Sequence, residues 1–520
     1  MSKHTEKTSI RRNVLASYVA QLYVSFIGIF MAPFYISYMG TEAYGLIGFF
    51  TMMAMWFQLL DMGLTPTLLR ETARFRGGAI SAEELRAFLR VLEGIFGAVS
   101  FVGGVALAVS STWISTHWLK ADHLPAGQVT AAVMLMGLAA PFRWVSGIYR
   151  GVMNGFEQQV WLGTYDISIT TVRFVGVLGV LVLVDTTPKS FFAYQLVVAM
   201  IELAGLVIKT YGQVRTDGKK STKFSFSSLR RTLGFSLTIA FTATAAIVVS
   251  QVDKLMLSTM LSLEQFGVFS IAIAAAGAIN SVYQPFGQAL MPRLTKLVAE
   301  GDTAALATLY RQSTQVVCTL LAPAVVTVAC FAEPILWSWT GKPELAHQAA
   351  PILALYAIGN GWIGLSAFAY YLQYAHGDMR LHLIGNVVLS AILIPLLFVA
   401  TKYFGAFGSG TVLAGLYGAY ALGWVPVIHA RIWKGQHWHW MVRDILPIIV
   451  PTVLAGVLLK AIVPWPDGRW ATLSVCIAMA GSLLGVATAS SSVVRMRAVV
   501  VLQAAIPAFA RRQSETIEKE

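Results

Sequence analysis

Runs of about 20 consecutive apolar residues recur along almost the whole chain, and no other feature constrains the fold as strongly. A helix of that length crosses a hydrocarbon layer of about 30 Å. The runs are apolar on every side rather than at alternate positions, which favours helices over the strands of a membrane barrel. Only 12% of the residues are charged, against roughly 25% in soluble proteins. The sequence therefore predicts an all-α polytopic membrane protein.

The apolar runs predict about 14 transmembrane helices, an even number that leaves both termini on the same side. The expected spans are 13–38, 45–66, 88–110, 128–149, 160–184, 190–212, 233–256, 265–288, 314–340, 348–372, 381–400, 407–429, 444–463 and 470–490.

Charge placement gives the expected orientation. Of the 38 Lys and Arg residues, 29, including Arg150, fall in the terminal segments and loops of one side, 6 in loops of the other, and 3 within spans. The positive-inside rule then places both termini in the cytoplasm. This pattern also argues against nucleic acid as the reason for the net charge of +13. The apolar run after the basic residues 1–12 is too long for a cleavable signal peptide.

The longest polar stretch divides the spans into two related sets. We expect an N-lobe at 1–212, a cytoplasmic inter-lobe loop at 213–232, a C-lobe at 233–430, two extra spans at 431–492 and a cytoplasmic tail at 493–520. The segments "YISYMGTEAYGLIGFF" and "MLSTMLSLEQFGVFSI" occupy matching places, so that Gly45 corresponds to Gly267. Two equivalent six-helix lobes are typical of transporters with a substrate site at the lobe interface.

The segment "APFYISYMGTEAYGLIGFFTMMAMWFQLLDMGLTPTLLRETAR" resembles the opening of bacterial polysaccharide-biosynthesis flippases. These are the O-antigen and exopolysaccharide translocases of the multidrug/oligosaccharidyl-lipid/polysaccharide exporter superfamily. "YRGVMNGFEQQ", "SQVDKLMLSTMLSLEQFGVFSIA" and "QPFGQALMPRLTKL" extend the resemblance over about residues 1–310. The shared pattern consists of Pro33, Gly40, Tyr44, Gly45, Asp61, Gly63, Leu64, Arg70 and Arg74.

The resemblance implies a V-shaped, two-lobed fold that works by alternating access. It implies an undecaprenyl-pyrophosphate-linked oligosaccharide as cargo, moved to the periplasmic leaflet of the bacterial inner membrane for O-antigen or exopolysaccharide synthesis. Such a protein is a transporter rather than an enzyme, needs no cofactor beyond a coupling H⁺ or Na⁺, and acts as a monomer beside glycosyltransferases and a polymerase. The peptidoglycan-precursor flippases are a neighbouring branch that also has fourteen helices.

Ionisable side chains inside the spans are the candidate site residues, because a charge in the bilayer is costly. Counting residues from the cytoplasmic ends brings Arg173 level with Glu202, and Arg143 level with Asp166, so we expect each arginine to pair with the carboxylate at its level. An Arg fork matches phosphate oxygens, so these arginines suit a pyrophosphate. The alternative is that the ion pairs only hold helices together. The expected substrate-binding residues are Arg143, Arg173 and Arg70, and the expected ion-coupling or pairing residues are Asp61, Asp166, Glu202 and Asp253.

Other residues suggest how the helices move or stop. Pro33, Pro285 and Pro292 lie within spans and predict hinges of a gate, or else static kinks. Asp61 precedes helix-breaking residues and either caps freed N–H groups or binds cargo or ion. Asp253 and Lys254 are expected to point apart by about 100°, with Lys254 reaching to the interface.

Two further patterns favour plain structural roles. The "HWHW" at 437–440 is read as an interfacial aromatic belt rather than a metal site, and the three cysteines as core thiols.

Two other functions stay open: a multidrug or small-cation exporter of the same superfamily, and a membrane glycan polymerase or ligase. The exporter needs acidic cavity residues. The enzyme needs a sizeable outer loop, whereas the longest one here, 111–127, carries few ionisable residues.

Overall fold

The protein is helical throughout the part that can be described. The computed structural model describes residues 3–61, 63–214 and 248–497, with side chains from residue 19 onward. Within these ranges the β-structure is limited to one isolated bridge between Lys120 and Ser262. Among the described residues, ten helices are long and apolar enough to cross a membrane, or twelve if each of two sharply bent pairs counts as one span. The predicted all-α membrane fold is therefore confirmed.

The predicted number of spans, about 14, stays a prediction. One stretch, Arg380–Ile432, is 53 residues long and would rise about 80 Å as a straight helix, more than twice the hydrocarbon thickness. It breaks at Gly405, where φ is 56° and ψ is −140°, between the spans predicted at 381–400 and 407–429. Of the span predicted at 233–256, residues 233–247 lie outside the described residues. So does most of the predicted inter-lobe loop, 213–232.

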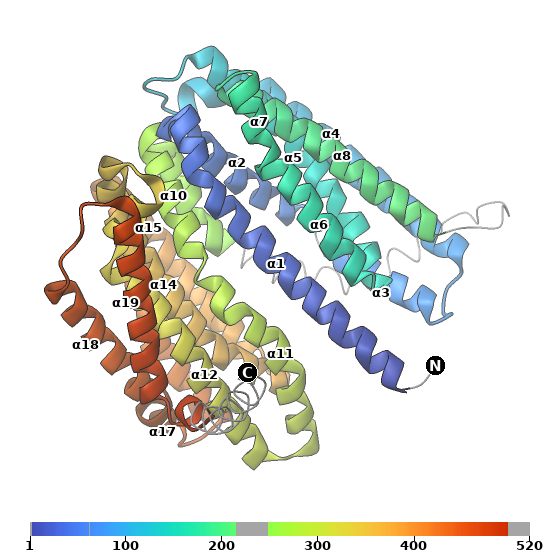
Figure 1. Cartoon of the computed structure of the whole chain (residues 1–520). Coiled ribbons are helices and arrows are strands. Elements are labelled where there is room, and N and C mark those ends of the chain that lie inside the picture. The colour runs from blue at the N-terminus through green and yellow to red at the C-terminus, as the bar shows by residue number, and fades with distance from the viewer. Residues whose placement is uncertain (1–2, 62, 215–247, 498–520) are drawn as a thin grey trace, which may run out of the picture. The chain divides into compact units, whose positions relative to one another are not determined.

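The chain divides into two compact units, Met1–Ile271 and Ala272–Glu520. In the first unit, α5 packs against α4 and α8, and α6 packs against α1 (Figure 1). Close approach of α4 and α5 depends on small residues: a Cβ on Gly137 would lie 2.8 Å from Leu107 Cβ. The named helices of this unit are α1 (Lys3–Met39), α2 (Thr41–Leu59), α3 (Leu64–Arg76), α4 (Ala82–Trp113), the π-helix η1 (Ile114–Trp118), α5 (Ala126–Gly155), α6 (Gln159–Phe174), α7 (Gly176–Leu183) and α8 (Pro188–Gln213), together with the first part of α10 (Leu263–Gly277).

Helices α2 and α10 cross with their backbones in contact at two glycines. A Cβ on Gly45 would collide with the backbone oxygen of Leu263, and a Cβ on Gly267 would collide with that of Thr41. Gly45 thus faces Leu263, four residues before Gly267, and Gly267 faces Thr41, four residues before Gly45. The two halves of this contact are equivalent, as in a contact with two-fold symmetry. These are the two glycines that the sequence comparison placed at matching positions.

In the second unit, α14 contacts α11, α12, α13 and α15. Its core includes Tyr310, Phe368 and Trp440, each at most 1% exposed. The helices at the C-terminal end, α18 and α19, both pack on α12 and on each other. The remaining helices of this unit are α11 (Asn280–Glu300), α12 (Thr303–Cys330), α13 (Ala332–Thr340), α14 (Pro343–His376), α15 (Arg380–Ala419), η2 (Tyr420–Trp424), α16 (Val425–Ile432), α17 (His437–Trp440), η3 (Met441–Ile445), α18 (Leu446–Ile462) and α19 (Arg469–Ser490).

A buried polar network fastens the last two long helices to α12. The Asp444 carboxylate, 1% exposed, accepts hydrogen bonds from Arg311 Nε at 2.7 Å and from Gln315 Nε2 at 2.7 Å. Gln315 Oε1 accepts from Ser491 Oγ at 3.1 Å and from Val493 N at 3.1 Å. Since Asp444 precedes α18 and Ser491 follows α19, one side chain of α12 links both ends of this pair.

Candidate functional site

Five ionisable side chains from three helices meet inside the first unit. Arg143 and Arg150 lie on α5, Asp166 and Arg173 on α6, and Glu202 on α8. These three helices lie alongside one another in Figure 1. They belong to stretches long and apolar enough to cross a membrane, Ala126–Gly155, Gln159–Leu183 and Pro188–Gln213, the second of which also includes α7. We call this group the charge cluster.

Glu202 is the centre of the charge cluster because its two oxygens bind different arginines. Oε1 accepts from Arg150 Nη2 at 2.6 Å, and Oε2 accepts from Arg173 Nη2. The other amino group of Arg150 binds Asp166. The side chains of Glu202 and Arg173 are only 5% and 10% exposed. The predicted pairing of Arg173 with Glu202 is confirmed, whereas that of Arg143 with Asp166 is wrong, since Arg150 holds this carboxylate.

Arg150 was assigned by sequence to a cytoplasmic loop, and this assignment is wrong. It lies five residues before the end of α5, but helical side chains lean toward the N-terminus of their helix, which brings its guanidinium group back along α5. The seven-residue spacing from Arg143 places both on one helix face. That spacing was the sequence signal that could have added Arg150 to the site.

Arg143 contributes a positive charge that the ion pairs do not use. Among the described residues, none of the ion pairs involves Arg143. Its guanidinium carbon lies 5.4 Å from the centre of the Phe50 ring, a cation–π contact with α2. It also interacts electrostatically with Arg173, Glu202 and Arg150. The charge cluster thus holds three guanidinium groups and two carboxylates, which leaves one positive charge in excess.

Neutral hydrogen bonds fix the helices around the charge cluster. Tyr165 Oη donates to the backbone oxygen of Glu202 at 2.8 Å, and Gln195 Nε2 donates to that of Arg173 at 3.4 Å. The first bond requires a glycine one turn along α8, because a Cβ at Gly205 would collide with the Tyr165 hydroxyl. Both bonds hold α6 and α8 at the separation that the Arg173–Glu202 pair needs.

Helix α3 is positioned by Asp61 and by small residues of α5. The Asp61 carboxylate accepts from Thr65 Oγ1 at 2.5 Å and from Thr65 N at 3.3 Å, so it caps the start of α3 as one of the two predicted readings expects. Helix α5 approaches α3 closely at this residue, since a Cβ on Gly151 would lie 3.1 Å from Thr65. Arg70 lies exposed on α3 and takes no part in the three ion pairs of the charge cluster.

Asp253 lies in the helical segment 248–260, where its side chain is buried. The prediction that Asp253 and Lys254 point apart is wrong. Lys254 Nζ approaches Asp253 Oδ1 at 3.3 Å and donates to Ser250 O at 2.6 Å. The flexible four-carbon stem of lysine allows this, even though adjacent Cβ atoms diverge. Ion binding at Asp253 stays a prediction.

The three predicted hinge prolines all lie inside helices. Pro33 lies in α1, and Pro285 and Pro292 lie in α11. The bend of 41° between α10 and α11 falls at 278–279, just before the turn in which Pro285 deprives Ser281 O of its helical partner. A hinge function for these prolines stays a prediction.

Two of the four residues of "HWHW", His437 and Trp440, are buried, whereas Trp438 is 73% exposed. The reading as an interfacial belt is therefore wrong for His437 and Trp440 and stays a prediction for Trp438. Trp440 is 1% exposed and donates from Nε1 to Thr314 Oγ1 at 3.0 Å. His437 Nδ1 and His429 Nδ1 lie 2.9 Å apart, and His429 Nε2 lies 2.9 Å from Tyr310 Oη. The π-helical geometry of residues 441–445, which follow this segment, was not foreseeable from the apolar pattern.

Comparisons with known proteins agree on family and fold. A family model described as "Polysaccharide biosynthesis protein" matches residues 10–298, more than half of the chain. No curated protein matches. The lipid II flippase MurJ in an inward closed conformation aligns with a TM-score of 0.69 and 12% identity, over 94% of this chain and 100% of MurJ.

Multidrug transporters share the fold as well. An inward-facing multidrug resistance MATE family transporter of the MOP superfamily aligns with a TM-score of 0.65 and 12% identity, over 79% of this chain and 94% of its own. The MATE multidrug transporter DinF-BH aligns with a TM-score of 0.57 and 15% identity, over 82% of this chain and 95% of its own. These identities establish the fold alone. The family match, which covers more than half of the chain, shows that this chain belongs to the polysaccharide biosynthesis protein family.

Proposed function

We propose that the protein is a flippase that moves an undecaprenyl-pyrophosphate-linked oligosaccharide from the cytoplasmic to the periplasmic leaflet of a bacterial inner membrane. The glycan serves O-antigen or exopolysaccharide synthesis, and both termini of the carrier face the cytoplasm. Transport proceeds by alternating access coupled to H⁺ or Na⁺. The family supports a role in polysaccharide synthesis, and one protein with the same fold, MurJ, is a lipid II flippase.

The observation that carries this proposal is the excess positive charge of the charge cluster. Arg143 lies about 18 Å along α5 from its C-terminal end, deep enough to be inside the hydrocarbon layer. A charge at this depth is retained only if it has a use, because burying it is costly. A diphosphate supplies the missing negative charge, and a guanidinium group binds its oxygens with two parallel hydrogen bonds.

The ion pairs around Glu202 then have a second role. They hold Arg150 and Arg173 in place when the cargo is absent, so that the phosphate site is preformed. The arriving diphosphate adds negative charge that competes with the two carboxylates for the guanidinium groups, and so weakens the ion pairs of Asp166 and Glu202. Asp166 or Glu202 is thereby a candidate acceptor for the coupling H⁺ or Na⁺.

The alternative of a small-cation exporter fits the charge cluster less well. A cationic cargo near Arg143 meets a net positive charge and is repelled, whereas a cation exporter needs an excess of carboxylates. A polymerase or ligase remains the more distant alternative. The loop between η1 and α5 spans only residues 119–125, where the backbone N–H groups of Asp122, His123 and Leu124 bind Glu42.

The test is transport by purified protein in liposomes. A fluorescent undecaprenyl-pyrophosphate-linked glycan is loaded into the inner leaflet, and its arrival in the outer leaflet is measured with an impermeant quencher. We expect Arg143→Gln to slow this transfer about tenfold or more, since it removes a charge-assisted bidentate contact. Arg143→Lys keeps the charge but not the fork, and should give an intermediate rate.

The matched control is Lys296→Gln on α11, which removes one positive charge from a side chain that is 74% exposed. It should leave the rate unchanged. Transfer by Arg143→Gln at the wild-type rate would refute the phosphate role. Transport of a cationic dye in place of the glycan would favour the exporter. In cells, Arg173→Gln should abolish surface glycan while the protein stays in the membrane.

A further inference from the structure

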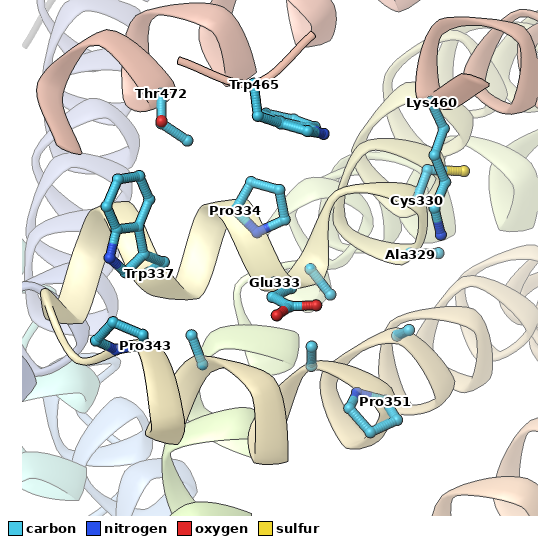
Figure 2. Close-up of a pocket in the computed structure, with 14 residues that line it drawn as sticks. Ala329, Cys330, Glu333, Pro334, Trp337, Pro343, Pro351, Lys460, Trp465 and Thr472 are labelled. Atoms are coloured by element: carbon cyan, nitrogen blue, oxygen red, sulfur yellow. The ribbon is translucent and has the colours of Figure 1, made fainter. Parts of the chain in front are cut away.

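The second unit contains a cavity of about 700 Å³ that the proposed transport role does not use. Its walls come from α13 and α14 and from the helix ends and loop beside them. Figure 2 shows the Glu333 carboxylate near the middle of the cavity, between α13 and α14, and Lys460 reaching down beside Cys330 and Ala329. The lining residues are Ala329, Cys330, Ala332, Glu333, Pro334, Trp337, Pro343, Ala346, Ala350, Pro351, Ala354, Lys460, Trp465 and Thr472.

Small apolar side chains make most of the cavity wall. Five alanines and three prolines contribute to it, and none of them can reach across the space or offer a side-chain hydrogen bond. An occupant that covers this wall must itself be largely apolar, because a polar molecule would lose its hydrogen bonds to water without replacement. The volume falls within the usual range of ligand pockets.

Two opposite charges stand on different walls. Glu333 lies in the first turn of α13 and Lys460 in the last turn of α18, positions where the helix dipoles favour these charges. Glu333 Oε1 accepts a hydrogen bond from His347 Nδ1 at 3.1 Å, and its side chain is 55% exposed, which leaves the second oxygen accessible. Trp337 and Trp465 add indole rings to the same space.

We propose that this cavity binds one zwitterionic phospholipid of the bilayer. Lys460 contacts the phosphate, Glu333 and the face of Trp337 contact the ammonium group, and an acyl chain covers the alanines and prolines. A zwitterionic head group matches an acid and a base held apart, whereas an anionic lipid meets repulsion from Glu333. Tryptophan is enriched at the head-group level of membranes and attracts ammonium groups to its face.

The first experiment measures which lipid the full chain retains. The protein is delipidated in detergent, and phosphatidylethanolamine or phosphatidylglycerol is added at equal concentrations. Native mass spectrometry then counts the lipids on each chain. We expect one tightly held phosphatidylethanolamine per chain and a clear preference for it over phosphatidylglycerol. Lys460→Gln should weaken its binding about tenfold by removing a charge-assisted hydrogen bond. Glu333→Gln should abolish the preference.

The matched control is Lys402→Gln, at a lysine of α15 outside the cavity whose amine lies 5.8 Å from the centre of the Tyr403 ring. This variant should bind lipid like the wild type. Equal retention of both lipids by the wild type, or unchanged binding in Lys460→Gln, would overturn the proposal. Displacement of phosphatidylethanolamine by undecaprenyl phosphate at equal concentration would overturn it too, because the site would then belong to the carrier lipid.

The second experiment reads occupancy from the cavity itself. Cys330 lines the cavity and is partly exposed, while the other two cysteines of the chain, Cys318 and Cys476, are buried. Alkylation of Cys330 by a maleimide should slow about tenfold when phosphatidylethanolamine saturates the site. The Ala354→Trp variant, which fills part of the space, should slow alkylation without added lipid. An alkylation rate that is the same with and without phosphatidylethanolamine contradicts the proposal, whatever the result of the transport assay.

Discussion

Replacement of Glu202 by glutamine tests the architecture of the charge cluster most directly. This carboxylate neutralises two arginines, and its side chain is only 5% exposed. After Glu202→Gln, Arg150 still holds Asp166, but Arg173 keeps only a neutral amide oxygen for its buried charge. The reverse substitution, Arg173→Gln, leaves Glu202 bound to Arg150. The two halves of one ion pair should therefore have unequal effects on stability.

The size of the difference follows from what each substitution leaves behind. Breaking a buried pair by removing one partner costs about 3–5 kcal/mol, because the other charge is left uncompensated. Glu202→Gln should lie near the lower limit, about 3 kcal/mol, since the amide still accepts one hydrogen bond. Arg173→Gln should cost about 1.5 kcal/mol, the lower end for a lost hydrogen bond between charged groups, because Arg150 still neutralises Glu202. The double variant removes both charges and should recover about 2 kcal/mol relative to Glu202→Gln.

Thermal unfolding of the detergent-purified variants, followed by intrinsic fluorescence, checks this ranking. For a unit of this size 1 kcal/mol corresponds to about 2 °C, so Glu202→Gln should lower the midpoint by about 6 °C. The double variant should regain more than half of that loss. The reasoning is refuted if Arg173→Gln destabilises as much as Glu202→Gln, or if the double variant is less stable than either single one.

Two further predictions concern helix contacts and are checked by the same unfolding assay. Gly45→Ala should cost about 1–3 kcal/mol, because its Cβ meets the backbone of α10, whereas Gly94→Ala on α4, with open space around it, should be neutral or slightly stabilising. An equal effect of both would contradict the close crossing of α2 and α10. Asp444→Asn should cost about 2–3 kcal/mol by leaving Arg311 without its carboxylate, while Asp378→Asn, in an exposed pair with Arg431, should stay within about 0.5 kcal/mol. Similar losses in these two variants would rule out the buried network as a fastening of the last helices.

The sequence by itself determined the class of the protein. Apolar runs about 20 residues long can only be helices in a membrane, since backbone groups in lipid must bond within their own segment. Counting along these runs also placed Arg173 level with Glu202, because the rise per residue of a helix is fixed. The motif around Gly45 and Asp61 was local enough to indicate the family that the comparison then established.

Only the tertiary structure decided which partners the charged side chains take. Arg150 looked like a loop residue because the predicted span ended at residue 149, whereas α5 continues to Gly155. Its reach back along α5 placed it against Asp166 and Glu202, and so left Arg143 as the excess positive charge. Trp440 looked interfacial because tryptophan is common at membrane interfaces, but packing on α12 buries it. Periodicity fixes the depth of a residue in the membrane, but its partners depend on the rotation and packing of helices that are distant in sequence.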